Sequence, residues 1–401
     1  MLISVPGRRF FTVLCIALLL PVYTSYAAVQ YTLPALSEKA KLSLITCGQG
    51  EESHSLFGHT ALRIQDPELS LDRIYNYGTF YFEEPDFLWK FLRGELLYWL
   101  DIEDGINRFL YVYYREKREV IEQVLSFSHK EVNDIFLFLE ENRKPENCYY
   151  LYDFVRDNCT TRVRDVLIKA YGENYILNPV PIFTYRTHLR DCLKPMPWTD
   201  LGITLLLGSR LDKPVNVNEA MFLPGMLMKQ TSNTFNKTGN TSIVLKTNFM
   251  LKGNKIIAPG VWTHPTVLSV IFFCLSIYLY FCRWNKKKIN RIYDLFLFTA
   301  TGITGFIIAF MWFFTNHYGT ADNWNLIIIS PIHIIYAVMG WRLSPKVLKI
   351  YIYYIIASVL LFPVVVLISG QAIHIVVWLI TLIMVFRALY ILKRVKSLNS
   401  L

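Results

Sequence analysis

Five long apolar segments in the last third of the chain most constrain its fold. They cover residues 267–282, 295–314, 326–341, 350–368 and 372–392. A helix needs about 20 apolar residues to cross the hydrocarbon core of a bilayer, and most of the five approach that length. The third is short and contains Pro331 and His333, which favours a segment that packs on its neighbours or lines a cavity. We therefore predict an all-α bundle of five transmembrane helices over residues 262–401.

Clusters of lysine and arginine next to these segments indicate their orientation. The clusters lie at residues 283–291, 342–346 and 393–396. Basic loops favour the cytoplasmic side of a membrane, and one path puts all three there, with the N-terminal region outside and the C-terminus in the cytoplasm. Topology thus explains most of the formal net charge of +10, and we expect no nucleic-acid partner.

The first residues have the three parts of an export signal. Two arginines precede an apolar run at residues 10–20, and Ser25 and Ala27 suit a small-residue cleavage site. An uncleaved anchor helix is the alternative, but the apolar run falls short of the about 20 residues that cross a bilayer. We predict a signal peptide over residues 1–28.

Residues 29–207 have the pattern of an exported mixed α/β domain. The stretches HTALRIQ and RIYNYGTF alternate like two paired strands around a turn. Residues 108–125 begin strand-like and become mixed, whereas residues 129–142 have the broad apolar face of a helix. Polar residues then replace the pattern, so we predict an irregular membrane-proximal connector over residues 208–261.

Export changes how the cysteines are interpreted. Cys47, Cys148, Cys159 and Cys192 lie in the predicted exported region, where disulfides form. A disulfide at Cys159 would make it structural, and the chain would then be a membrane scaffold or lipid-binding module without catalysis. A bridge between Cys148 and Cys192 would instead leave the other two thiols free.

Cys159 also has the local features of a nucleophile. It follows the capping-type residues Asp157 and Asn158 and precedes apolar residues at helical spacing, which predicts a position in the first turn of a helix. A helix N-terminus lowers the pKa of a thiol. Cys47 precedes a predicted strand and lacks this effect. No His/Cys pair has metal-ligand spacing, and we predict no metal and no cofactor.

A nucleophilic cysteine needs a base, and His59 is the best candidate. It opens a predicted strand after Gly58, which allows close backbone approach. Alternation puts its side chain on a face that a helix can cover. Asn76, on the adjacent strand beside Gly78, is the predicted third residue, which orients the imidazole. The alternative histidines are His54, His129 and His188.

These residues carry a resemblance to a known family. A histidine, a polar residue on the next strand and a cysteine that starts a later helix are similar to the permuted NlpC/P60 arrangement. More closely, TCGQGEESHSLFGHTALRI, YNYGTF and YLYDFVRDNCTTRVRD resemble the Lnb family of bacterial envelope proteins over residues 37–225, and FFTNHYGTADNWN agrees with it. The resemblance implies an α+β papain-like (permuted NlpC/P60) domain in the periplasm, joined to five transmembrane helices in the inner (cytoplasmic) membrane.

The resemblance also implies lipoprotein N-acyltransferase activity. Cys159 would attack an ester of a membrane phospholipid, the acyl donor, while His59 moves the proton. The α-amine of a diacylated lipoprotein, the acceptor, would then take the acyl chain from the thioester. A cell-wall cysteine peptidase or amidase is an alternative on the same fold, although a single membrane anchor would suffice for it.

Four residues are predicted to contact substrate. Arg63 shares the strand face of His59 and suits a phosphate group. Asn158 and Thr160 either add donors to the Cys159 backbone amide around an oxyanion or simply cap the helix. His317, in a polar outer loop, either contacts substrate or belongs to an interfacial turn.

Overall fold

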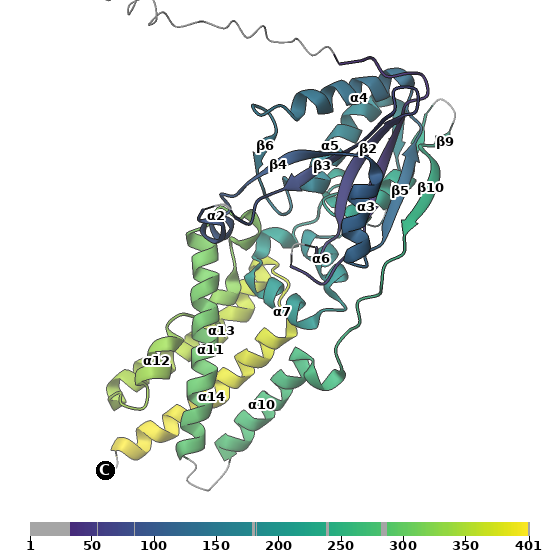
Figure 1. The fold of residues 1–401 in the computed structure, drawn as a ribbon. Coiled ribbons are helices and arrows are strands. Elements are labelled where there is room, and N and C mark those ends of the chain that lie inside the picture. Colours follow the sequence, from purple (N-terminus) through teal and green to yellow (C-terminus); the bar gives the residue numbers. More distant parts are fainter. Residues whose placement is uncertain are drawn as a thin grey trace, which may run out of the picture. The chain divides into compact units, whose positions relative to one another are not determined.

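A seven-stranded sheet forms the framework of the exported region (Figure 1). Its strand order is β10-β5-β1-β2-β3-β4-β6, and neighbouring strands pair antiparallel. The strands are β1 (Lys41–Cys47), β2 (His59–Asp66), β3 (Leu71–Thr79), β4 (Leu97–Asp104), β5 (Val120–Leu125), β6 (Tyr149–Leu151) and β10 (Val244–Leu251). The central strands are almost entirely buried because helices cover both faces of the sheet.

The computed structural model describes residues 33–399 except 54, 84, 179, 180, 182, 238, 239 and 282–286. The predicted signal peptide and His54 lie outside the described residues. Leu36–Leu401 form one compact unit, in which the sheet region comes first and a helical region follows. The structure therefore confirms an α+β domain followed by helices.

Helices α3 (Ile106–Arg115) and α5 (Cys159–Tyr171) cover opposite faces of the sheet (Figure 1). Phe109 and Tyr113 of α3 pack in one core cluster with residues of β1, β2, β3 and β5. On the other face, Thr160 of α5 meets Thr60 of β2, with 3.3 Å between the two hydroxyl oxygens. Because Thr60 precedes Ala61 of the α3 cluster, strand alternation places the two helices on different faces.

Other elements complete the exported region. The helices are α2 (Phe87–Arg93), α4 (His129–Asn142), α6 (Tyr185–Leu193), α7 (Pro197–Leu206), α8 (Val217–Ala220), α9 (Pro224–Ser232), η1 (Gly172–Asn174) and η2 (Ser209–Asp212). A three-stranded sheet contains β7 (Tyr175–Leu177), β8 (Thr234–Asn236) and β9 (Thr241–Ser242). The predicted helix at residues 129–142 is confirmed, and a capping box between Ser128 and Glu131 starts it.

Two predictions about the exported region are wrong. Residues 106–115 form α3, although the sequence is strand-like, because Phe109 and Tyr113 bury at helical spacing. The predicted irregular connector contains α8, α9 and three strands, and its β10 pairs with β5 as an edge of the main sheet. Residues 252–260, which have no helix or strand, match the expectation.

The α-helices in the described part of the C-terminal region are α10 (Pro265–Phe281), α11 (Lys287–Phe313), α12 (His333–Met339), α13 (Pro345–Ser369) and α14 (Ile375–Asn399). Among the described residues, α11, α13 and α14 are long and apolar enough to cross a membrane, while α10 has 17 residues. A buried ion pair between Asp294 of α11 and Arg387 of α14, 2.6 Å apart, joins two of these helices.

The third predicted span is not one continuous helix. It divides into the 3-10 turn η5 (Trp324–Ile327), a bend at Pro331 and the short α12. His333 stabilises the bend, because one ring nitrogen lies 2.9 Å from the Ile328 carbonyl oxygen and the other lies 2.8 Å from the Tyr351 hydroxyl. A count of five spans stays a prediction.

Candidate active site

Cys159 is the first residue of α5, as predicted. Asn158 is the N-cap, and its side-chain oxygen accepts hydrogen bonds from the Thr160 and Thr161 amides at 2.8 and 2.9 Å. Asp157 does not cap the helix, because its carboxylate pairs with Arg162. The positive end of the α5 dipole therefore acts at the position of the thiol.

His59 and Asn76 lie beside Cys159, at the start of β2 and near the end of β3. The His59 Nε2 atom is 2.5 Å from the Asn76 Oδ1 atom. An amide oxygen only accepts hydrogen bonds, so Nε2 carries a proton, and Nδ1 is left for the Cys159 thiol, which hydrogen bonds with this imidazole. The structure thus brings together the three residues predicted to be catalytic.

Cys159 and His59 shift each other's pKa. Burial opposes ionisation of Cys159, but the charge of the His59 imidazole and its hydrogen bond outweigh burial and lower the pKa of the thiol. Burial also opposes protonation of His59, but the Cys159 charge and the hydrogen bonds that the imidazole makes with Cys159 and Asn76 raise its pKa. The pair therefore favours the thiolate, which is the nucleophilic form of cysteine.

Cys47, which is buried, and Cys192, which is partly buried, lack such a partner. Burial raises the pKa of Cys47 to about 12 and that of Cys192 to about 11. Cys47, Cys148, Cys159, Cys192 and Cys274 are all free thiols in the structure. The structure therefore contradicts both a disulfide at Cys159 and the bridge between Cys148 and Cys192.

Gly78 allows a close approach of α5 to the sheet. Its φ is +93°, in the left-handed region, and an added Cβ would lie 3.1 Å from the Cys159 Cβ. A side chain at this position would therefore strain the backbone and press against the residue that holds the thiol.

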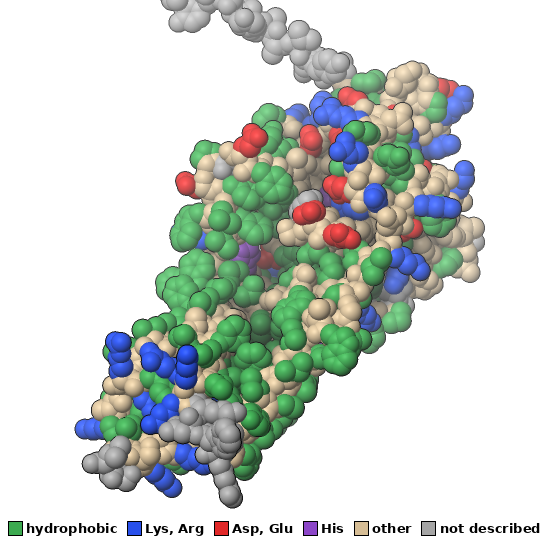
Figure 2. Space-filling view, turned by 60° about the horizontal axis from the view of Figure 1, so that its bottom comes forward, with side chains coloured by type: hydrophobic (Ala, Val, Ile, Leu, Met, Phe, Trp, Pro, Cys, Tyr) green, Lys and Arg blue, Asp and Glu red, His purple; other side chains and the backbone are tan. Residues whose placement is uncertain are grey.

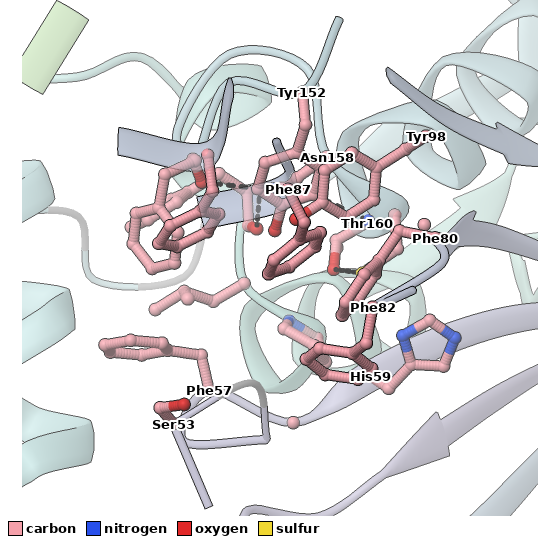
Figure 3. A pocket seen from close by; sticks show the side chains of 18 of the residues that line it. Ser53, Phe57, His59, Phe80, Phe82, Phe87, Tyr98, Tyr152, Asn158 and Thr160 are labelled. Atoms are coloured by element: carbon pink, nitrogen blue, oxygen red, sulfur yellow. Dashed lines mark hydrogen bonds between the residues drawn. The ribbon is translucent and has the colours of Figure 1, made fainter. Parts of the chain in front are cut away.

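The Cys159 side chain faces a cavity of about 380 Å³. The cavity wall is mainly aromatic, and six of its rings belong to Phe80, Phe82, Phe87, Phe91, Tyr98 and Tyr152. Figure 3 shows labelled rings of this group around the space next to His59 and Thr160. Such a wall suits an apolar group better than a charged peptide.

The structure does not bring Arg63 to this cavity, so the predicted phosphate contact is not supported. The Arg63 side chain is only 8% exposed and forms ion pairs with Asp72 at 2.7 Å and Glu122 at 2.9 Å. Strand alternation gave its face correctly, but Arg63 lies four positions along β2 from His59, and the two carboxylates neutralise its charge.

Asn158 and Thr160 line the cavity, but the polar atoms of Asn158 are already used. Its amide nitrogen donates to the Phe154 and Phe222 carbonyls at 2.7 and 3.1 Å, in addition to the cap. Asn158 therefore caps the helix, and its side chain is not available as an oxyanion donor. The Thr160 hydroxyl oxygen is 3.8 Å from the Cys159 sulfur.

His317 does not line the cavity. One of its ring nitrogens lies 3.0 Å from the Phe91 carbonyl oxygen, so it contacts the end of α2. The rival histidines also lie outside the cavity: His129 bonds to the Leu36 carbonyl, and His188 lies on α6, four residues from Cys192.

Some residues next to the site were not predicted from the sequence. The Tyr150 hydroxyl is buried without a hydrogen-bond partner among the described residues, and it would lie 3.8 Å from a Cβ on Gly78. Glu103 of β4 hydrogen bonds to Asn76, and burial together with Asp101 raises its pKa. The aromatic run CYYLYDF just before Cys159 was a signal for the tyrosines, whereas nothing local marked Glu103.

Comparisons with known proteins agree with the division of the chain into a sheet region and a helical region. The model of the Lnb N-terminal periplasmic domain matches residues 30–191, and the model of the Lnb transmembrane domain matches residues 258–397. Comparison with curated proteins found no match, and neither did comparison with solved structures. The two family matches cover the Cys159 site and the apolar helices, respectively. The chain therefore belongs to the Lnb family and is a membrane protein with a periplasmic N-terminal domain.

Proposed function

We propose that this protein is a lipoprotein N-acyltransferase with Cys159 as its nucleophile. The donor is a membrane phospholipid, and the acceptor is the α-amine of a diacylglyceryl-cysteine lipoprotein. One observation carries the proposal: a thiol at a helix N-terminus contacts an imidazole that Asn76 orients, next to an aromatic cavity. Family membership supports it as well.

In the first step, the Cys159 thiolate attacks the carbonyl carbon of a phospholipid ester. A carbon–sulfur bond forms, the ester carbon–oxygen bond breaks, and His59 gives its proton to the departing lysophospholipid oxygen. The Cys159 backbone amide is the proposed oxyanion donor, because the Asn158 side chain already occupies the next two amides of α5.

In the second step, the α-amine of the acceptor attacks the thioester carbonyl. His59 accepts a proton from this nitrogen, an amide bond forms, and the carbon–sulfur bond breaks to restore the Cys159 thiolate. The aromatic wall supports transfer over hydrolysis, because it holds the acyl chain and leaves little room for water near the thioester.

The proposal extends to fold and membrane topology. The antiparallel strands that hold His59 and Asn76, together with the helix that starts at Cys159, support a permuted papain-like domain. The turn after α13 lies beside the outer loop, since the Gln371 amide nitrogen is 3.3 Å from the Asn323 side-chain oxygen. Both segments therefore belong to one side of the membrane, and the proposed five crossings of the inner membrane then put the C-terminus in the cytoplasm.

The test is reconstitution of the full chain with acyl-labelled phospholipid and a diacylated lipopeptide. We expect Cys159→Ser and His59→Ala to abolish labelled N-acyl product, and Asn76→Ala to reduce it less. Cys192→Ser is the matched control, because this thiol lies outside the cavity and has a raised pKa; it should keep full product. Unchanged product in Cys159→Ser would refute the thioester mechanism.

A further inference from the structure

The segment over residues 80–93, which contains α2, exposes apolar side chains to an unusual extent. None of the seven residues of α2 is buried. Leu88 is 66% exposed, Trp89 is 51% exposed and Phe82 is 65% exposed. Clustered exposure of large apolar side chains on a folded domain indicates a contact with a membrane or another apolar surface.

The same segment also forms part of the cavity wall. Phe87, Leu88 and Phe91 line the cavity that holds Cys159. The ring centroids of Phe80 and Phe87, both labelled in Figure 3, are 5.8 Å apart. Those of Phe87 and Phe91 are 6.1 Å apart. A single layer of apolar side chains therefore separates the cavity from the surroundings.

The C-terminal end of α2 is attached to the outer end of α11, a helix long enough to cross a membrane. The Asn316 amide donates to the Arg93 carbonyl at 2.8 Å, and the ring centroids of Trp89 and Phe310 are 6.0 Å apart. Phe313, at the end of α11, is 61% exposed. The segment thus lies against the end of α11 that is nearest the sheet region.

The surface around this segment has the composition of a membrane interface. Figure 2 shows hydrophobic side chains gathered around a hollow, between the charged surface of the sheet region and the apolar helical region. Lys90 and Arg93 lie in the last turn of α2, next to its aromatic residues. Aromatic side chains with adjacent Lys or Arg are typical of elements at the boundary between lipid and water.

We infer that residues 80–93 lie in the bilayer leaflet nearest the exported domain, with Trp89 against lipid and the cavity opening sideways into that leaflet. The occupant of this apolar surface is bilayer lipid, because the surface is continuous with a membrane-crossing helix. An acyl chain then reaches Cys159 without crossing water; this use of the segment rests on the proposed function, whereas the membrane contact does not.

A spin-label measurement tests the membrane contact without any catalysis. A nitroxide is attached to Trp89→Cys in the full chain carrying Cys159→Ser, in vesicles of phosphatidylethanolamine and phosphatidylglycerol. Trp89 lies outside the cavity lining, so lipid contact there does not reflect the cavity. The matched control is Leu245→Cys on the edge strand β10, which is 66% exposed. Labelled protein without either new cysteine gives the background.

We expect the label at position 89 to collide more with oxygen, which concentrates in lipid, than with a water-soluble nickel complex. The label at position 245 should show the reverse. Equal access of the nickel complex to both positions would overturn the inference. Because Cys159 is replaced in every sample, this outcome is independent of acyl transfer, and a failure of the proposed function would leave the measurement intact.

Discussion

Replacement of His59 by glutamine should convert Cys159 into an ordinary buried thiol. Glutamine is of similar size and keeps an amide that can hydrogen bond with Asn76, but it has no charge. The protein contains its own reference: burial without an imidazole raises the pKa of Cys192 from the ordinary 9.0 to about 11. In the native protein, burial also opposes ionisation of Cys159, but the His59 charge and hydrogen bond outweigh it and lower the pKa of the thiol.

These values give the size of the effect. A rise of about 2 pKa units above an ordinary thiol lowers the thiolate fraction at neutral pH about 100-fold and corresponds to about 3 kcal/mol. The loss relative to the native protein is larger, because native Cys159 starts below 9.0. With a lowered pKa, the native thiolate persists as the pH falls and disappears only below that pKa, whereas the variant loses its thiolate at a much higher pH.

Alkylation by iodoacetamide as a function of pH measures this directly, because only the thiolate reacts. Mass spectrometry of the peptide that contains Cys159 separates its rate from those of the other thiols. His188→Gln is the control, since His188 lies outside the cavity, and its profile should match the native one. A neutral-pH rate in His59→Gln within a few-fold of the native rate would refute the assigned origin of the lowered pKa.

Two further substitutions test how the site is held. Gly78→Ala should slow Cys159 alkylation and acyl transfer together, since its Cβ would lie 3.1 Å from the Cys159 Cβ at a φ of +93°. Gly225→Ala is the control, because a Cβ at that position would have no other atom within 4 Å. Equal rates in the two variants would contradict the close-packing argument. Asn158→Ala should destabilise the start of α5 by about 2 kcal/mol, because it removes a cap and leaves two carbonyls unpaired. Hydrogen exchange of the α5 amides measures this loss, which should exceed the about 1 kcal/mol expected for the more exposed cap Ser128→Ala on α4.

The parts of the site that depend on neighbouring residues were predictable from the sequence. Asn158 and the helical spacing after Cys159 define the start of α5 without any tertiary information. A short turn joins β2 and β3, so their pairing is local, and Asn76 follows from the same alternation that places His59. These three predictions needed only short-range rules.

Contacts between distant segments were not predictable in this way. Alternation gave the face of Arg63 but not its distance from the cavity, and its partner Glu122 lies on β5, which is not adjacent to β2. The stretch that forms α3 has strand-favouring aromatic residues, and burial of Phe109 against the sheet decided its structure instead. β10 is an edge strand in which no residue is buried, so its sequence has little hydrophobic signal.

The return of β10 to the sheet matters for anyone who wishes to prepare the exported region in water. A fragment cut at residue 207 would lose the edge strand β10. Strand β5 would then become the edge of the sheet, with unpaired backbone groups that favour aggregation. It would also lose Phe222, Leu223 and Pro224, which line the cavity. A fragment should instead end after Leu251, where the pairing of β10 with β5 ends. Such a fragment would still contain the exposed apolar side chains of the α2 segment, so its buffer should contain a mild detergent.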